Sequence, residues 1–176
     1  MLRSNIKIAI AGFAVLTWSI CYLPALVVAR PIFAGGFGFS PIVYDKPVKG
    51  EATYRTGPTV DLYMGQIASS SLDLGLRVNA TGYQLDSNNP GARGYAGPTL
   101  SWSLSDSDNS MFVTAGAGSF FVHQAGNSHY RFGGGAILAA GVHLSPTLTV
   151  SFGSSGGQVK GASLAYAFAI IEWLKF

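Results

Sequence analysis

One segment near the middle of the chain alternates apolar and polar residues with a period of two. Its apolar positions are Leu72, Leu74, Leu76, Val78 and Ala80, and they alternate with Asp73, Gly75, Arg77, Asn79, Thr81 and Tyr83. Successive side chains of a β-strand point to opposite faces, whereas helical side chains share a face every 3.6 residues. The pattern therefore predicts a strand with one apolar face and one charged, hydrogen-bonding face.

The same alternation recurs between short turn-forming clusters over most of the chain beyond residue 29. Apolar positions repeat at Val60, Leu62 and Met64, at Leu100, Trp102 and Leu104, from Phe132 to Leu144, and at Leu148, Val150 and Phe152. Turn-forming residues separate these segments at 45–51, 68–71, 86–93, 105–110, 124–128, 145–147 and 154–160. Residues 36–44 and 111–122 are also strand-like, without a clear apolar face. Seven connections predict eight strands and an all-β fold.

The C-terminal segment carries the strongest version of this pattern. Large apolar residues share one face, and small residues share the other: Ala162, Leu164, Tyr166, Phe168, Ile170, Leu174 and Phe176 against Ser163, Ala165, Ala167 and Ala169. By analogy with the other segments, we expect the large residues to form part of the apolar outer face. Glu172 interrupts that face, which predicts a bulge or a position near the membrane interface.

The composition is unusual for a domain that is surrounded by water. Of 176 residues, 11% are charged and 48% are hydrophobic, and mean hydropathy is +0.33, whereas soluble domains average about 25% charged residues. Much of the folded surface is therefore expected to avoid water. The 12% of aromatic residues argues against disorder. A net charge of +3 is too small for electrostatic binding of nucleic acid.

The polar faces of the strands distinguish two kinds of barrel. A water-soluble barrel would turn its apolar face inward and carry many Lys and Glu residues outside. Here the polar face holds mainly Gly, Ala, Ser and Thr. A membrane barrel places apolar side chains toward lipid and polar ones inside, and eight strands leave an interior just wide enough for side chains to fill. The pattern predicts an eight-stranded antiparallel, up-and-down transmembrane β-barrel.

The N-terminus has the features of a secretory signal peptide. Arg3 and Lys7 precede an uncharged stretch, and the small residues Val27, Val28 and Ala29 precede Arg30. We expect cleavage after Ala29, which divides the chain into a signal peptide at 1–29 and a barrel at 30–176. An uncleaved membrane anchor is the alternative, because the apolar stretch is long enough to span a bilayer. The predicted mature chain has no cysteine, so disulfides cannot hold it together.

These features resemble the small eight-stranded bacterial outer-membrane β-barrels, the family that includes the transmembrane domain of outer-membrane protein A. The resemblance covers about residues 36–176 and rests on the strand pattern and on the aromatic-rich final segment from Tyr166 to Phe176. It implies that Phe176 is part of the signal for the barrel-assembly machinery. It also implies a bacterial outer-membrane location, with outer-membrane lipid and lipopolysaccharide as partners. The family includes adhesins and lipid-modifying enzymes, so the resemblance leaves the function open.

Four charged residues fall at predicted inward positions: Asp61, Asp73, Arg77 and Arg131. A charge enclosed in a barrel needs a partner. Asp73 and Arg77 lie four residues apart on one face, which favours a lumenal charge network that fills the barrel. A selectivity ring in an open pore is the alternative, and it would need a wider barrel.

One polar cluster is the candidate for catalysis. His123 and His129 flank the 124–128 segment, with Ser128 beside His129. Some outer-membrane barrels that modify lipid A use a His and a Ser near the outer rim, although the His-x-Ser spacing of the deacylases is absent here. Two other motifs are set aside. Gly153 to Gly157 matches Gly-x-Ser-x-Gly but lacks the following helix and His, and Asp106 to Ser110 lacks the later ligands of a calcium loop.

The leading functional hypothesis is a monomeric, non-enzymatic outer-membrane barrel with a structural or surface-interaction role and a side-chain-filled lumen. It implies no cofactor, no metal and no nucleic-acid partner. One alternative is a lipid A-modifying enzyme, an acyl hydrolase or acyltransferase, with its site at the outer rim. A second is a soluble periplasmic β-barrel carrier that is anchored by an uncleaved N-terminal helix.

Overall fold

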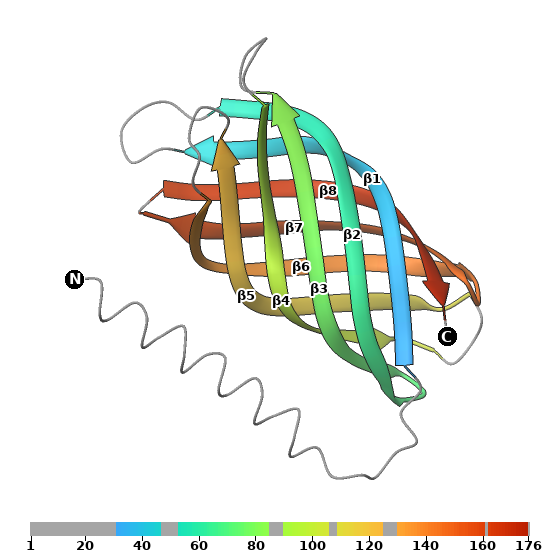
Figure 1. Cartoon of the computed structure of the whole chain (residues 1–176). Helices are drawn as coiled ribbons and strands as arrows, with labels where there is room; N and C mark the ends of the chain where they lie inside the picture. Colours follow the sequence, from blue (N-terminus) through green and yellow to red (C-terminus); the bar gives the residue numbers. More distant parts are fainter. Residues whose placement is uncertain are drawn as a thin grey trace, which may run out of the picture.

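The computed structural model is an all-β barrel of eight strands (Figure 1). It describes residues 31–46, 53–84, 90–105, 109–124, 130–160 and 162–175. The strands are β1 (Pro31–Lys46), β2 (Thr53–Ser69), β3 (Leu72–Gln84), β4 (Pro90–Ser103), β5 (Met111–Gln124), β6 (Arg131–Ser145), β7 (Leu148–Val159) and β8 (Ala162–Lys175). The predicted fold class and strand number are confirmed. The predicted signal peptide, residues 1–29, lies outside the described residues.

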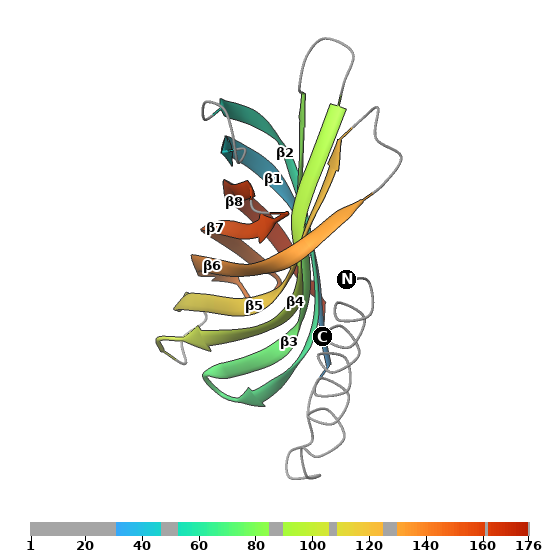
Figure 2. The ribbon, with the colours of Figure 1, turned by 90° about the vertical axis from the view of Figure 1, so that its left-hand side faces the viewer.

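Each strand pairs antiparallel with the next, and β8 pairs with β1 to close the barrel. Closure leaves no strand edge unpaired, which is the condition for strands to cross hydrocarbon. The strands are strongly inclined to one another and wrap around a common interior (Figures 1 and 2). No helix among the described residues has the length and hydropathy to cross a membrane.

Both ends of the described barrel lie at the same rim. Pro31 pairs with Gln66, and Phe33 pairs with Lys175. The start of β1 therefore lies beside the end of β8. We call this rim the terminal end; it also carries the two-residue turns 70–71 and 146–147. The opposite rim, the loop end, carries the connections between β1 and β2, β3 and β4, β5 and β6, and β7 and β8.

The outer wall is apolar, as the sequence predicts for most strands. In β2, Leu62 is 63% exposed while Asp61 is fully buried, and β3, β4, β6 and β7 follow the same predicted alternation. Exposed aromatic residues gather toward both rims: Phe33, Phe37, Trp102 and Trp173 toward the terminal end, and Tyr54, Tyr130 and Phe132 toward the loop end. Such aromatic girdles are typical of membrane barrels.

Strand β8 faces the opposite way to the prediction. Leu164, Tyr166, Phe168 and Ile170 are buried in the barrel, and the small residues between them form the outer wall. The physical reason is space: inward glycines on neighbouring strands leave room for large side chains. For example, a Cβ on Gly153 of β7 would lie 2.6 Å from Cζ of Phe168. The interior is therefore filled by large residues packed over glycines rather than by small residues throughout.

A β-bulge explains why the faces of β1 were ambiguous. Ser40 pairs with Gly57 and Val43 with Arg55, so β1 has one residue more than β2 across this step. Before the bulge the even-numbered Ile32, Ala34 and Ser40 are buried; after it the odd-numbered Val43 is buried. A bulge shifts which residues face inward, and a period-two pattern that reverses within one strand has no single apolar face.

Strand extends furthest into two of the predicted turn regions, 86–93 and 154–160. β7 continues through the glycines of 154–159, and the turn follows at Lys160, whose φ is 50°. β4 begins at Pro90, within the predicted 86–93 turn, and Arg93 is a fully buried lumenal residue. Both errors have one cause: glycines are read as turn formers, but here Gly91 leaves space for Tyr83 and Gly157 leaves space for Phe120 inside the barrel.

Candidate functional site in the barrel lumen

A row of inward-facing residues crosses six strands, from the terminal end of β6 and β7 to the middle of β3. Each residue of the row pairs with the next one on the neighbouring strand. His143 of β6 pairs with Thr149 of β7, which pairs with Glu172 of β8. Glu172 pairs with Gly36 of β1, which pairs with Asp61 of β2. Asp61 pairs in turn with Asn79 of β3. Neighbouring strands thus bring together polar side chains that lie far apart in the sequence.

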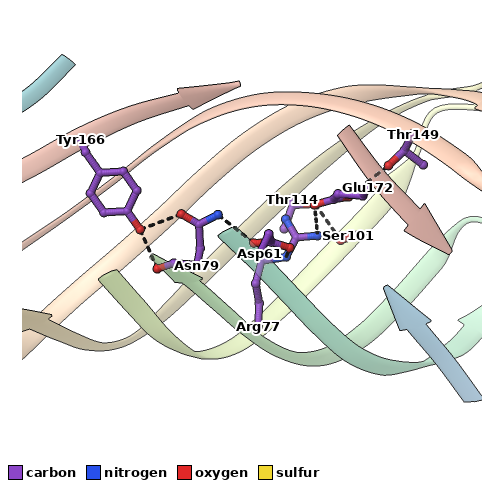
Figure 3. Close-up of polar contacts among 8 residues, drawn as sticks. All are labelled: Asp61, Arg77, Asn79, Ser101, Thr114, Thr149, Tyr166 and Glu172. Carbon is purple, nitrogen blue, oxygen red and sulfur yellow. Dashed lines mark hydrogen bonds and ion pairs between the residues drawn. The ribbon is translucent and has the colours of Figure 1, made fainter. Parts of the chain in front are cut away.

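Hydrogen bonds connect this row to the packed interior (Figure 3). Asn79 Nδ2 donates to Asp61 Oδ1 at 2.7 Å. The Tyr166 hydroxyl lies 2.8 Å from the Asn79 carbonyl oxygen and 2.7 Å from Asn79 Oδ1, and donates to these acceptors. Thr149 Oγ1 donates to Glu172 Oε2 at 3.1 Å. The row is therefore a connected network rather than a set of separate charges.

Arg77 lies between the two carboxylates of the network. Its Nε is 3.6 Å from Asp61 Oδ2, and its Nη2 is 3.2 Å from Glu172 Oε1. The three side chains are almost completely buried, at 4% exposed or less. The guanidinium also lies over the Tyr63 ring, with Cζ 5.4 Å from the ring centroid. One cation thus offsets two buried anions, and the cluster has a formal charge of −1.

Gly36 provides the space that this arrangement needs. It lies in the row between Glu172 and Asp61. A Cβ at this position would be 2.8 Å from Glu172 Cγ and 2.7 Å from the Ile171 carbonyl oxygen. Real Cβ contacts are longer than this, so any larger residue would displace Glu172 from its place beside Arg77.

The structure brings together only part of the predicted charge network. Asp61 and Arg77 form an ion pair. Asp73 lines the same cavity as Arg77, but the ion pairs of Arg77 go to Asp61 and Glu172. Arg131, at the start of β6, is exposed at the loop end, because this strand begins at the rim. It is not part of the lumenal cluster.

Glu172 is the network residue that sequence reasoning missed. The sequence prediction put it at a bulge or an interface on the outer face, but it is 2% exposed and points into the lumen. The β7–β8 register is regular through Thr149 and Glu172, with no bulge. The missed signal is that Glu172 shares a face of β8 with Tyr166, Phe168 and Ile170, so a charge on that face indicates the lumen rather than lipid.

A cavity of about 260 Å³ lies between this network and the terminal end. Its wall includes many hydroxyl groups, and its charged or titratable residues are Tyr63, Asp73, Arg77, His143 and Glu172. Ile32, Ile67 and Leu174 contribute apolar surface nearer the rim. The network therefore forms the inner boundary of a chamber at the terminal end.

Large side chains fill the barrel on the other side of the network. Tyr95, Phe120 and Tyr166 are at most 1% exposed and belong to one continuous apolar cluster. The Tyr95 hydroxyl donates to the Pro98 carbonyl oxygen at 2.6 Å. Nearer the loop end, Arg93 lies over the Tyr83 ring, with Cζ 4.4 Å from its centroid, and Nη1 donates to the Tyr44 carbonyl oxygen at 2.7 Å.

The proposed catalytic cluster is only partly described. His123 lies near the loop end of β5, where its ring stacks on Tyr130 with centroids 4.7 Å apart. Ser128 and His129 lie outside the described residues, as does Phe176. Ser155, from the rejected nucleophile motif, is buried and donates to the Ala136 carbonyl oxygen at 3.0 Å. Its position inside β7 corrects the sequence prediction, which placed it in the 154–160 turn.

The chain is similar to known proteins in structure but not in sequence. No protein-family model matches the chain, and no curated protein matches it in sequence. In structure the chain is similar to Ail, the attachment invasion locus protein of Yersinia pestis, with 9% identity, a TM-score of 0.57, and coverage of 83% of this chain and 99% of Ail. It is also similar to Neisserial surface protein A, with 10% identity, a TM-score of 0.57, and coverage of 82% and 98%.

In fold, the chain is a small outer-membrane-type β-barrel. The predicted resemblance is confirmed at the level of the fold, and the comparisons agree with the outer-membrane location that the sequence predicts. A second structure of Ail, in complex with the heparin analogue sucrose octasulfate, gives a TM-score of 0.53 at 12% identity and covers 83% of this chain and 99% of Ail.

Proposed function

We propose that the chain is a non-enzymatic outer-membrane barrel that presents its loop end at the cell surface for interaction with anionic partners. The proposal rests on the different character of three parts of the barrel. The wall is apolar, the interior is packed with aromatic residues, and charge is concentrated at the loop end. Such a molecule has a membrane-embedded wall and a solvent-facing rim with no wide channel between them.

The orientation follows from the ends of the strands. Short turns of transmembrane barrels lie on the periplasmic side and the longer connections lie outside. Two of the three connections at the terminal end have two residues, whereas three of the four at the loop end have five or six. We therefore assign the terminal end to the periplasm and the loop end to the cell surface.

Charge at the loop end favours an anionic partner. Basic residues at or between the strand ends of that rim are Lys46, Lys49, Arg55, Arg131 and Lys160, and the acidic ones are Asp45, Glu51 and Asp86. The terminal end has the opposite balance, with Asp106 and Asp108 against Lys175. The similar barrel Ail has been solved with a heparin analogue. By this likeness we propose sulfated or phosphorylated polysaccharides as the partner class.

The test is binding of sucrose octasulfate to folded protein in neutral lipid vesicles. The double variant Arg131→Glu and Lys160→Glu removes two exposed positive charges at the loop end and should weaken binding by about tenfold or more at low salt. Lys175→Glu, which reverses one charge near the end of β8, should leave binding unchanged. Equal affinity in all three proteins, or no binding by the wild type, would refute a surface role of this kind.

Ion conductance tests whether the lumen is closed. Protein inserted into a planar bilayer should give no steady ion conductance, because Tyr95, Phe120 and Tyr166 fill the lumen. A steady conductance that disappears with Arg77 variants would instead support the selectivity-ring alternative.

Two alternatives make different demands on the molecule. A lipid A-modifying enzyme would need His123, and replacing His123 or Ser128 by Ala should then stop an acyl-chain change produced by the wild type in lipid A mass spectra. Under our proposal the wild type produces no such change. A soluble anchored carrier would turn its apolar face inward, whereas the described wall has exposed Leu62, Val78 and Phe152.

A further inference from the structure

We propose that the chamber at the terminal end is a binding site for small primary ammonium ions. The chamber has about 260 Å³ of space and is lined by side chains from all eight strands. Nothing in the proposed surface role requires it. Three features support the inference: the charge balance of its wall, a buried hydroxyl without a partner, and the hydroxyl-rich lining.

The charge balance of the chamber favours a cation. Asp61, Glu172 and Arg77 form a cluster with a formal charge of −1 at its inner boundary. Asp73 adds a second negative charge from β3, and among the described residues it forms no ion pair. His143 also lines the wall, and its ring contacts Phe112 with centroids 4.8 Å apart. Carboxylates with a low-dielectric wall attract a cation and repel an anion.

Tyr63 supplies an observation that is independent of charge. Its side chain lines the chamber and is 7% exposed, and its hydroxyl is buried without a hydrogen-bond partner among the described residues. Glycines at Gly65 and Gly75 allow the ring to lie along the wall: a Cβ at Gly75 would be 2.6 Å from Tyr63 Cε2. A buried hydroxyl without a partner is costly, so this position calls for a ligand that can hydrogen-bond to it.

The lining favours an ammonium ion over a metal ion. The described residues contain no group of three His, Cys, Asp or Glu side chains that could hold a metal. In contrast, Ser101, Ser103, Ser110 and Ser145 bring hydroxyl acceptors to the wall. A primary ammonium group has three N–H donors and no acceptor. Its three donors match the kinds of acceptor on this wall: the Asp73 carboxylate, the Tyr63 oxygen and the serine hydroxyls.

The experiment is an NMR titration of the folded barrel in uncharged detergent micelles with 1,4-diaminobutane. Backbone amide shifts should saturate at the chamber residues Tyr63, Asp73 and His143 and remain unchanged at the loop end. Asp73→Asn should weaken the affinity by about tenfold, the effect of losing one charge-assisted hydrogen bond. Tyr63→Phe should weaken it by about threefold while leaving the charge intact.

Asp86→Asn is the matched control, because it removes one carboxylate from the segment between β3 and β4 at the loop end. It should leave diamine affinity unchanged. The proposal is overturned if the wild type shows no saturable shift, if Asp73→Asn and Tyr63→Phe both bind as the wild type does, or if Asp86→Asn weakens binding as much as Asp73→Asn. Saturable acetate binding at the same amides would also overturn it, because Arg77 rather than the carboxylates would then select the ligand. These outcomes are independent of sucrose octasulfate binding at the other rim.

Discussion

Glu172 Oε1 lies 3.2 Å from Arg77 Nη2, although β8 and β3 are separated in the wall by β1 and β2. The contact therefore crosses the lumen rather than following the sheet. Arg77 also lies beside Asp61 on the adjacent strand. One guanidinium thus joins opposite parts of the barrel at a depth where water is largely excluded, and this arrangement predicts strong coupling between the three side chains.

Replacing Arg77 by Gln should destabilise the barrel by about 3–5 kcal/mol, because two buried carboxylates lose the cation between them. The double variant Arg77→Gln with Glu172→Gln removes one positive and one negative charge and should recover much of this loss. Urea unfolding in lipid vesicles measures both. A double variant as unstable as the single one would mean that the ion pair contributes little to the stability of the barrel.

A positive charge on the outer wall should have a depth-dependent cost. Val78 is exposed near the middle of β3, where it pairs with Leu62 and Ala96. Val78→Arg should destabilise the inserted barrel by about 2–4 kcal/mol. Thr56→Arg places the same charge on the exposed wall of β2 near the loop end and should cost no more than about 1 kcal/mol. Equal costs for both variants in vesicle unfolding would contradict the assigned membrane-facing wall.

Gly91 should be coupled to the aromatic ring that lies over it. A Cβ at this position would have Tyr83 Cζ at 2.6 Å and Tyr83 Cε2 at 2.7 Å as its nearest neighbours. Gly91→Ala should therefore cost about 1–3 kcal/mol in the wild type and less in a Tyr83→Ala background. Gly134→Ala is the control, because no atom lies within 4 Å of a Cβ there. A double-mutant cycle of unfolding free energies with zero coupling would remove the steric explanation.

The turn between β7 and β8 should be open to stabilisation. Lys160 has a φ of 50°, a conformation that is unfavourable for most side chains but tolerated by Asn. The following residue is Gly161, and Asn-Gly is a preferred two-residue hairpin sequence. Lys160→Asn should raise the free energy of unfolding by about 0.5–1 kcal/mol, and Lys160→Val should lower it. If both variants destabilise the barrel equally, the backbone conformation is not the cause.

Much of the architecture could be predicted because strand alternation needs only local sequence. In β2 and β3 one face is apolar and the other holds Asp61, Arg77 and Asn79, so the direction of each side chain follows from period two alone. In β8 both faces lack charge over Ala162–Ile171, and the pattern cannot tell lumen from lipid. There the outcome depends on space left by glycines of other strands, such as Gly153 beside Phe168.

The candidate site was harder to predict than the fold for a related reason. The spacing of Asp73 and Arg77 suggests a partnership along one strand, but residues four apart on a strand are separated by about 13 Å. The actual partners of Arg77 come from β2 and β8. Which residues meet across a lumen depends on strand register and shear, and these are properties of the closed barrel rather than of any single segment.

The packing of aromatic rings over glycines on the adjacent strand has a consequence for assembly. A slip of two residues between neighbouring strands keeps every side chain on its correct face, so the apolar pattern alone does not oppose it. Such a slip would move Tyr83 away from Gly91 and Phe168 away from Gly153, and would bring each ring against a residue that has a Cβ. Steric clashes between rings and Cβ atoms therefore disfavour the shifted registers. The barrel can close in one register although its wall has few charges and many alanines.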